Sequence, residues 1–455
     1  MSLILSTVLL VCLSRWVCTE CAGPVCNDAR VGPDTCLPHS KFNVLSGHCD
    51  DSGSLFPENN TCFTCYTGHR CERLIPDCQV TVSISWPLFF HSVYWSVFPC
   101  PNGEPVTTIP SDFGLAYMFM QHGKDGLLPE LDDAIRNLHR LVGNVAGDLD
   151  DYIVLAGYGA THVTQALLRG VAMLADGWTT LFTQSPFYFH YEVWPEQISS
   201  VGHEMYFNTT LPGSGDINDS TVEILNIPAN PTGERRVPAV QNPRLTICDA
   251  VFNWPHFKTG GEAIQCDVHI FSLSKLTGHA GTRLGWALVH KSHAALYAAA
   301  AEYIHNISLG ISIDTQARGV TILRHLTSSS AFFEVTGAAL ARRWVALGEV
   351  ITNCGELELV NLEFEGPTAW LRVPPGKNCS ALLLQGGIVG ASGTMFGSDD
   401  SYVRLNMVDT DSTHALLLRH MKSLCGSIRS TGQPQAPSFQ NDVRRGFQRQ
   451  GAQFV

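Results

Sequence analysis

Residues 272–286 read SLSKLTGHAGTRLGW, and this stretch is the strongest signal in the chain. Its lysine, Lys275, follows the apolar run Val268–Phe271, which predicts a buried strand, and lies among serine, glycine and arginine residues. A lysine in such a setting shifts its pKa readily and can form a Schiff base with an aldehyde cofactor. Ser272 and Arg283 flank it with a hydroxyl and a guanidinium, both suited to binding a phosphate. The stretch therefore predicts pyridoxal phosphate as the cofactor.

A phosphate-bearing cofactor needs a second binding element. Residues 157–162, GYGATH, follow the apolar run Tyr152–Ala156 and precede a helical pattern over residues 163–174. Free backbone N–H groups at the start of a helix attract phosphate. We therefore expect a phosphate cup over residues 157–162.

Three residues match the remaining needs of the cofactor ring. A carboxylate beside the pyridine nitrogen keeps it protonated and makes the ring an electron sink, and Asp249 ends the predicted strand Leu245–Cys248 in the position for such an acid. Asn230 opens the segment 230–233, NPTG, which on its own is equally consistent with an ordinary turn. Tyr188 follows Ser-Pro-Phe and is suited to stacking on the ring, with core packing as the alternative.

A candidate substrate residue lies near the C-terminal end. Arg404 occurs in the otherwise apolar segment Tyr402–Leu405, YVRL. One basic residue inside a buried strand is costly without a partner. A guanidinium binds a carboxylate through two hydrogen bonds, so we expect Arg404 to bind the carboxylate of an amino-acid substrate.

The surrounding pattern predicts an α/β fold. Short apolar runs alternate with helical or turn segments, which indicates parallel β-α-β units with ligands at the carboxyl ends of the strands. The predicted strands are Tyr152–Ala156, Thr180–Thr183, Val222–Ile227, Leu245–Cys248, Val268–Phe271 and Trp286–Val289. An amphipathic helix is predicted over residues 127–142, and residues 294–350 are mostly helical in pattern.

Length and charge narrow the class of protein further. A chain of 455 residues predicts at least two domains. The formal net charge of −12 and the lack of a Lys/Arg run in the folded part argue against nucleic acid as a partner. No segment after the N-terminal apolar run is apolar enough for a membrane span. A small-molecule substrate fits these features best.

The cysteines are concentrated at one end. Ten of the sixteen lie between Cys12 and Cys78, which predicts a disulfide-rich module there. Zinc is the alternative, because Cys62 and Cys65 have C-x-x-C spacing. No second such pair or histidine pair follows at a suitable spacing, so disulfides are favoured and no metal is expected.

The N-terminus and the sequons predict the secretory route. Leu3–Leu13 is an apolar run of signal-peptide length. The N-x-S/T sequons that agree with this route are at Asn59, Asn208, Asn218, Asn306 and Asn378. The expected location is extracellular or vacuolar.

These motifs resemble those of alliinase and the plant tryptophan aminotransferase-related proteins. The resemblance covers roughly residues 45 to 420 and rests on the lysine motif, on residues 249–256 (DAVFNWPH) and on the NPTG segment. It implies the pyridoxal-phosphate-dependent aminotransferase-like fold (fold type I), with a mostly parallel sheet and a small α/β second domain. The cysteine spacing over residues 62–78 resembles the EGF-like module of this family, which implies the disulfide pairs Cys62–Cys71 and Cys65–Cys78.

The resemblance also implies roles for individual residues. Lys275 would bind the cofactor and later move the Cα proton of the substrate, and Arg404 would bind the substrate carboxylate. Asp249 would pair with the pyridine nitrogen, Asn230 with the ring hydroxyl, and Tyr188 with the ring face. The cofactor phosphate would be bound by Ala160, Thr161, Ser272 and Arg283. Tyr117 resembles a tyrosine that reaches the phosphate from a neighbouring subunit, which implies a homodimer.

The chain departs from the family pattern in three places. Phe252 replaces a tyrosine that usually bonds the ring oxygen, and Ala160 and His162 replace a serine and a glutamine of the phosphate cup. Asn60 stands where the EGF-like module usually has a cysteine.

The expected organisation is a signal peptide over residues 1–22, the EGF-like module over 23–78, a large cofactor-binding domain over 79–300, a small domain over 301–425 and a disordered tail over 426–455. The leading hypothesis for function is an alliinase-like C–S β-lyase acting on an S-substituted cysteine or its sulfoxide. An aminotransferase of the tryptophan–pyruvate type is the alternative. An inactive secreted binding protein is a third, and the retained Lys275, Asp249 and Arg404 argue against it.

Overall fold

The computed structural model describes residues 78–83, 89–95, 107–119, 123, 126–175, 177–199, 203–211, 220–363 and 365–431, and four two-residue strands nearer the N-terminus. These strands form two antiparallel pairs, β1 (Phe42–Asn43) with β2 (His48–Cys49) and β3 (Tyr66–Thr67) with β4 (Arg73–Leu74). Among the described helices, none is long and apolar enough to cross a membrane.

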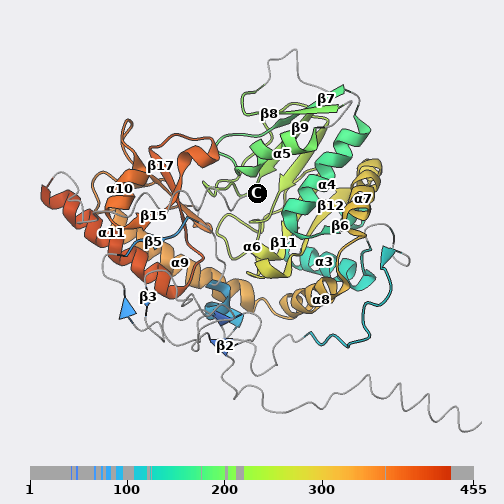
Figure 1. The fold of residues 1–455 in the computed structure, drawn as a ribbon, viewed down its shortest axis with the longest axis horizontal. Coiled ribbons are helices and arrows are strands. Elements are labelled where there is room, and N and C mark those ends of the chain that lie inside the picture. The colour runs from blue at the N-terminus through green and yellow to red at the C-terminus, as the bar shows by residue number, and fades with distance from the viewer. Residues whose placement is uncertain are drawn as a thin grey trace, which may run out of the picture.

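A seven-stranded sheet forms the centre of the large domain (Figure 1). Its strand order is β6-β12-β11-β10-β9-β7-β8. The strands are β6 (Tyr152–Gly157), β7 (Gly177–Phe182), β8 (His203–Asn208), β9 (Thr221–Asn226), β10 (Leu245–Asp249), β11 (Val268–Ser272) and β12 (Gly285–His290). Only β12 runs antiparallel to its neighbours, so the mostly parallel sheet expected from the sequence is confirmed.

Helices cover both faces of this sheet because alternate residues of its strands are apolar on each side. On one face lie α4 (Gly159–Leu174), α5 (His190–Ile198) and α7 (Ala294–Ser308). On the other lie α3 (Pro129–Val142) and α8 (Ile313–Ser328). The second face has a core that continues into the small domain. The strands between these two helix layers run parallel, so their carboxyl ends lie at one edge of the sheet.

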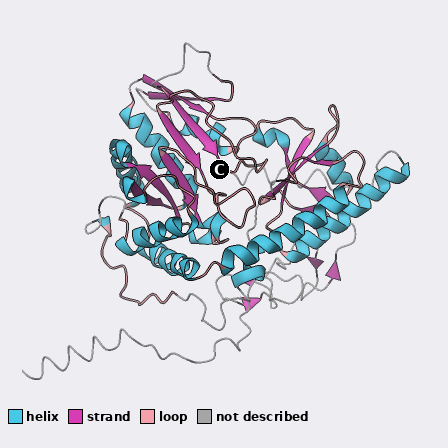
Figure 2. Ribbon diagram, turned by 180° about the vertical axis from the view of Figure 1, so that it is seen from behind, coloured by secondary structure: helices cyan, strands magenta, loops and turns pink. Residues whose placement is uncertain are grey.

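The small domain contains a second sheet and two long helices. Its strands follow the order β13 (Glu358–Leu359), β14 (Thr368–Arg372), β17 (Tyr402–Asn406) and β16 (Ala391–Ser392). The two long helices are α9 (Ala331–Ile351) and α11 (Asp411–Thr431), and a short helix, α10 (Cys379–Gln385), lies between them in the sequence. The long helices α9 and α11 pack against each other, as Figure 2 shows from behind, and a disulfide joins Cys354 to Cys425.

Two parts of the chain lie in domains other than those expected. Strand β5 (Val80–Thr81) was expected in the large domain, but it pairs with β15 (Ile388–Val389) of the small domain. Helix α8 packs against α3, which places it with the large domain although it follows residue 300.

The start of the C-terminal tail was predicted wrongly. The disordered tail was expected from Gly426, but α11 continues to Thr431. The helix extends because Ile428 is buried against the core and Cys425 is tied to Cys354. Residues 432–455 lie outside the described residues.

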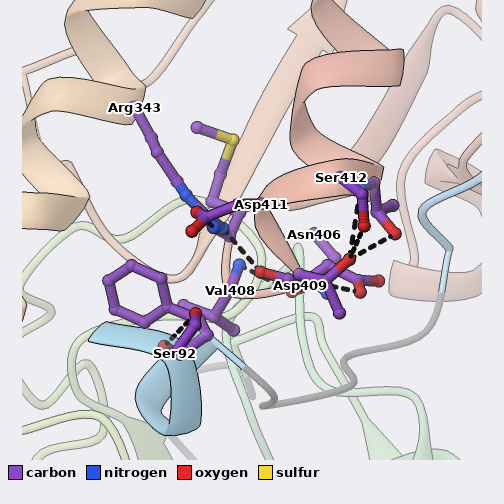
Figure 3. Close-up of polar contacts among 11 residues, drawn as sticks. Ser92, Arg343, Asn406, Val408, Asp409, Asp411 and Ser412 are labelled. Carbon is purple, nitrogen blue, oxygen red and sulfur yellow. Dashed lines mark hydrogen bonds and ion pairs between the residues drawn. The ribbon is translucent and has the colours of Figure 1, made fainter. Parts of the chain in front are cut away.

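A buried arginine joins the small domain to the helical turn over residues 89–95 (Figure 3). Arg343 of α9 donates from Nη1 to the carbonyl oxygens of Met407 at 2.9 Å and Asp409 at 2.7 Å. It also pairs with the carboxylate of Asp411, and its guanidinium lies 4.6 Å from the centre of the Phe89 ring. These contacts connect three segments that are distant in the sequence: α9, residues 407–411 and the turn at Phe89.

This junction predicts a pH-dependent stability. Burial raises the pKa of Asp409 to about 6, so the folded protein retains a proton that the unfolded chain has lost. The free energy of unfolding should therefore fall by up to roughly 3 kcal/mol as the pH rises from about 4 to 6. Asp409→Asn should remove this dependence, which denaturant titrations of both proteins at several pH values will measure. Parallel pH profiles would contradict the assignment.

Candidate active site

The candidate site lies where the carboxyl ends of the parallel strands face the small domain. The end of β10 carries Asp249, and the end of β11 carries Ser272 and then Lys275. The loop after β9 carries Asn230, and Arg404 comes from β17 of the small domain. The fold thus brings together residues that the sequence predicted from separate motifs.

Lys275 lies on α6 (Leu273–Leu276), a single helical turn directly after β11. Ser272 caps this turn, because its hydroxyl accepts from the N–H of Ser274 at 3.1 Å. Burial lowers the pKa of Lys275 to about 8, and the positive charge of Arg404 adds to this effect. A lysine with such a pKa has a larger neutral, nucleophilic fraction near pH 7 than a surface lysine.

Asp249 is buried and held by a tyrosine that the sequence did not predict. The hydroxyl of Tyr191 donates to Oδ2 of Asp249 at 2.5 Å. Burial raises the pKa of Asp249, while the Tyr191 hydrogen bond and the positive charge of Lys275 oppose that rise. The backbone is held as well, because Nδ2 of Asn226 donates to the carbonyl of Asp249 at 3.1 Å. A bound pyridinium would supply the positive partner that this carboxylate suits.

Tyr188 lies beside this pair. Its ring meets the Tyr191 ring edge-on with the centroids 5.6 Å apart, and its hydroxyl bonds Nδ1 of His190 at 2.7 Å. Burial and the charge of Asp249 raise the pKa of Tyr188 to about 12, so the phenol stays neutral. A neutral aromatic face next to Asp249 is consistent with stacking on the cofactor ring. Phe252 is buried nearby, 5.7 Å from Nζ of Lys275 to the ring centre.

Arg404 uses two of its five N–H donors in hydrogen bonds to neutral partners. It donates from Nη1 to Oδ1 of Asn230 at 3.1 Å and from Nη2 to the carbonyl of Ser83 at 2.8 Å. Its Nε is buried without a hydrogen-bond partner in the described part of the chain. Burial lowers the pKa of Arg404 to about 10. The guanidinium also lies over Phe396, 4.6 Å from the ring centre. An incoming carboxylate would satisfy both the charge and the free Nε–H.

The residues predicted to form a phosphate cup lie at the N-terminus of α4. Tyr158 caps the helix without a side-chain hydrogen bond, and Gly159 has φ +84°, a conformation that favours glycine. A Cβ at Gly285 of the adjacent strand would lie only 2.5 Å from the N of Ala160, so only glycine allows this close approach. Arg283 donates from Nη2 to the carbonyl of Tyr158 at 3.1 Å. The half-buried Ala160 and Thr161 follow in the first turn, where backbone N–H groups are free for an anion.

Tyr117 is not brought to the site by a contact within the described residues. It is 60% exposed and lies in the segment 107–119, where its ring contacts Phe119 with centroids 5.4 Å apart.

Several predicted modification sites lie outside the described residues. They are the sequons at Asn59 and Asn218 and the cysteines Cys62, Cys65 and Cys71. Cys78 is disulfide-bonded. Of the remaining sequons, Asn306 and Asn378 are exposed and Asn208 is half-buried. A disulfide that the sequence did not predict joins Cys248 of β10 to Cys266.

Comparisons with known proteins show the family and the fold of the chain. The family model described as allinase matches residues 87–425. Tryptophan aminotransferase-related protein 3 of Arabidopsis thaliana is 28% identical over 84% of this chain and 84% of its own length. Alliin lyase of Allium cepa var. aggregatum is 26% identical over 84% of this chain and 89% of its own. The fold is similar to that of an aminotransferase from Staphylococcus aureus, with a TM-score of 0.58, 18% identity, and coverage of 77% of this chain and 95% of that one.

The fold, the half-buried lysine and the family match define the class of protein as a pyridoxal-phosphate-dependent lyase or transaminase. The chain belongs to the allinase family, whose model covers most of its length.

Proposed function

We propose that this protein is a C–S β-lyase that uses pyridoxal phosphate to cleave S-substituted L-cysteine or its sulfoxide. One observation carries the proposal: Lys275, Asp249 and Arg404 converge at one strand edge, and the pKa of this lysine is lowered to about 8. The match to the allinase family and the similarity to alliin lyases support the choice of reaction.

Each residue has a defined task in this proposal. Asn230, Asp249 and Tyr188 would hold the ring of the cofactor, and the phosphate would lie at the start of α4 with Ser272 and Arg283 beside it. When bound, the cofactor supplies an electron sink for the Cα carbanion of the substrate.

The remaining steps belong to the protein's own side chains. Arg404 binds the substrate carboxylate and so orients the Cα–H bond. Nζ of Lys275 removes the Cα proton, after which the group at Cβ determines the outcome. A sulfur leaving group departs with its bonding electrons, and hydrolysis of the remaining aminoacrylate yields pyruvate and ammonia.

Transamination is the second candidate, because the tryptophan aminotransferase-related proteins are as similar to this chain as the alliin lyases. The same residues serve both reactions, so substrates decide between them. The purified protein is given an S-alkyl cysteine sulfoxide alone and, separately, tryptophan with pyruvate. Pyruvate and ammonia from the first mixture support the lyase. Alanine from the second, with the first inert, overturns it. A protein that stays colourless with added pyridoxal phosphate and is inert in both assays would instead support the binding-protein hypothesis.

We also propose a secreted or vacuolar homodimer with a signal peptide, an EGF-like module that contains the pairs Cys62–Cys71 and Cys65–Cys78, and N-linked glycans. The support for secretion is the apolar N-terminal run together with the sequons. The support for a dimer is the segment 107–119, which exposes Leu115 by 84% and Tyr117 by 60%. Exposed apolar side chains of this kind mark interaction surfaces.

Leu115→Asp should dissociate the dimer, because a charge in an apolar interface loses its hydration. Sedimentation velocity will show the change from dimer to monomer. Val237→Asp is the matched control, since Val237 is 74% exposed but lies outside this segment. A wild-type protein that sediments as an active monomer would remove the proposal.

A further inference from the structure

We propose that Tyr191 is a positioning residue that fixes the Asp249 carboxylate and leaves its Oδ1 available for the ring nitrogen of the cofactor. The inference rests on the proposed cofactor and deepens it, because it names the group that prepares the carboxylate before the cofactor binds.

The two carboxylate oxygens of Asp249 differ in their hydrogen bonds. Oδ2 accepts from the Tyr191 hydroxyl at 2.5 Å, a short bond between two buried groups. Within the described part of the chain, Oδ1 accepts only from the N–H of Val251, at 3.4 Å, which is the outer limit of a hydrogen bond. One oxygen is therefore firmly held, and the other has capacity for a further donor.

Tyr191 can act only as a donor in this pair. Burial, and then the negative charge of Asp249, raise the pKa of Tyr191 well above its ordinary value, so its proton stays on the phenol. A hydrogen bond to the carboxylate favours its charged form, which burial alone would disfavour. The pair thus keeps an acceptor ready for a positively charged partner.

The surroundings hold Tyr191 in place. It is the second residue of α5, its N–H bonds the carbonyl of Tyr188 at 3.0 Å, and its ring lies 5.6 Å from that of Trp194. The side chain is fully buried, so the hydroxyl has little freedom to leave Asp249. The same short segment therefore provides both an aromatic face and the partner of the carboxylate.

The test compares two cofactors on the complete protein. Pyridoxal phosphate can donate from its ring nitrogen to Asp249, whereas a 1-deaza analogue has a C–H at that position and cannot. Tyr191→Phe should lower the affinity for pyridoxal phosphate roughly tenfold to hundredfold, which is the range for loss of a hydrogen bond to a charged group. The same substitution should lower the affinity for the deaza analogue less than about twofold. Binding is followed by fluorescence quenching, so the readout does not depend on turnover.

Two further proteins separate positioning from a general loss of structure. Tyr152→Phe removes another buried phenol of the large domain, one that bonds the carbonyl of Ala146 at 3.1 Å, and should leave both affinities within about twofold of wild type. In an Asp249→Asn background, adding Tyr191→Phe should no longer change the affinity for pyridoxal phosphate, because the charge that Tyr191 serves is gone.

The outcomes are distinct. Equal weakening of both cofactors by Tyr191→Phe, or no weakening of either, overturns the inference alone. A wild-type protein that binds no pyridoxal phosphate overturns the proposed function, and the inference with it. Selective weakening of pyridoxal phosphate supports both.

Discussion

Lys275→Ala is expected to lower the rate of product formation by roughly a thousandfold or more, because one side chain both binds the cofactor and moves the Cα proton. The lysine is half-buried at the end of β11, with burial and the charge of Arg404 lowering its pKa to about 8. Alanine removes the amine and provides no replacement base. Steady-state assays with a cysteine sulfoxide, and the visible absorbance of the bound cofactor, measure both losses.

The control for this variant is a lysine of the same chain with an ordinary surface role. Lys258 is exposed and pairs with Glu365 at 2.7 Å. Lys258→Ala should retain activity within about twofold, since an exposed ion pair contributes little. The unfolding temperature of Lys275→Ala should not fall, because the substitution removes a cation that is partly withdrawn from water. Wild-type activity in Lys275→Ala would refute the assignment.

Arg404→Lys is expected to lower kcat/KM by roughly a hundredfold, because an ammonium cannot reproduce the bidentate hydrogen bonds of a guanidinium. The loss should appear mainly in KM if the arginine binds the carboxylate equally in the ground state and the transition state. Steady-state kinetics with the amino acid and with its amide will separate the contributions. The amide lacks the carboxylate, so the substitution should affect it far less.

Arg372→Lys is the matched control for Arg404→Lys. Arg372 lies on the neighbouring strand β14, but its side chain is exposed and pairs with Glu358 at 2.5 Å. Its replacement should leave kcat/KM within about twofold of wild type. An Arg404→Lys protein with an unchanged KM and kcat would exclude this residue from substrate binding.

The sequence predicted the parts of the site that follow directly from strand ends. Asp249 and Lys275 each come immediately after a run of buried residues, so the position of a polar side chain at the sheet edge was visible in the pattern. Arg404 was visible as an isolated charge in an apolar strand. These assignments needed no knowledge of which strands are neighbours.

The partners of those residues could not be predicted, because they depend on tertiary contacts. Tyr191 reaches Asp249 from 58 residues away, and the carbonyl of Ser83 reaches Arg404 from 321 residues away. Backbone acceptors such as Ser83 leave no signal in side-chain patterns. The aromatic run after Tyr188 was the only sign of Tyr191, and core packing explained that run equally well.

In the fold, too, local patterns were predictable from the sequence and pairings between distant segments were not. The sequence predicted six strands of the large sheet but missed β8, an edge strand whose sequence HEMYFN contains no continuous apolar run of the kind that marked the other strands. It also missed the pairing of β5 with β15, because such short strands contain too few residues for a pattern. Residues 426–455 were expected to be disordered, whereas α11 continues to Thr431.

The covalent bond between the cofactor and Lys275 is the central claim, and borohydride reduction tests it most directly. Reduction of the protein saturated with pyridoxal phosphate fixes the cofactor to the nitrogen that holds it, and peptide mass mapping then locates the label. We expect the pyridoxyl group on the peptide that contains Lys275, and its loss from that peptide when substrate is added before reduction. Label on another lysine, or no label at saturation, would contradict the account.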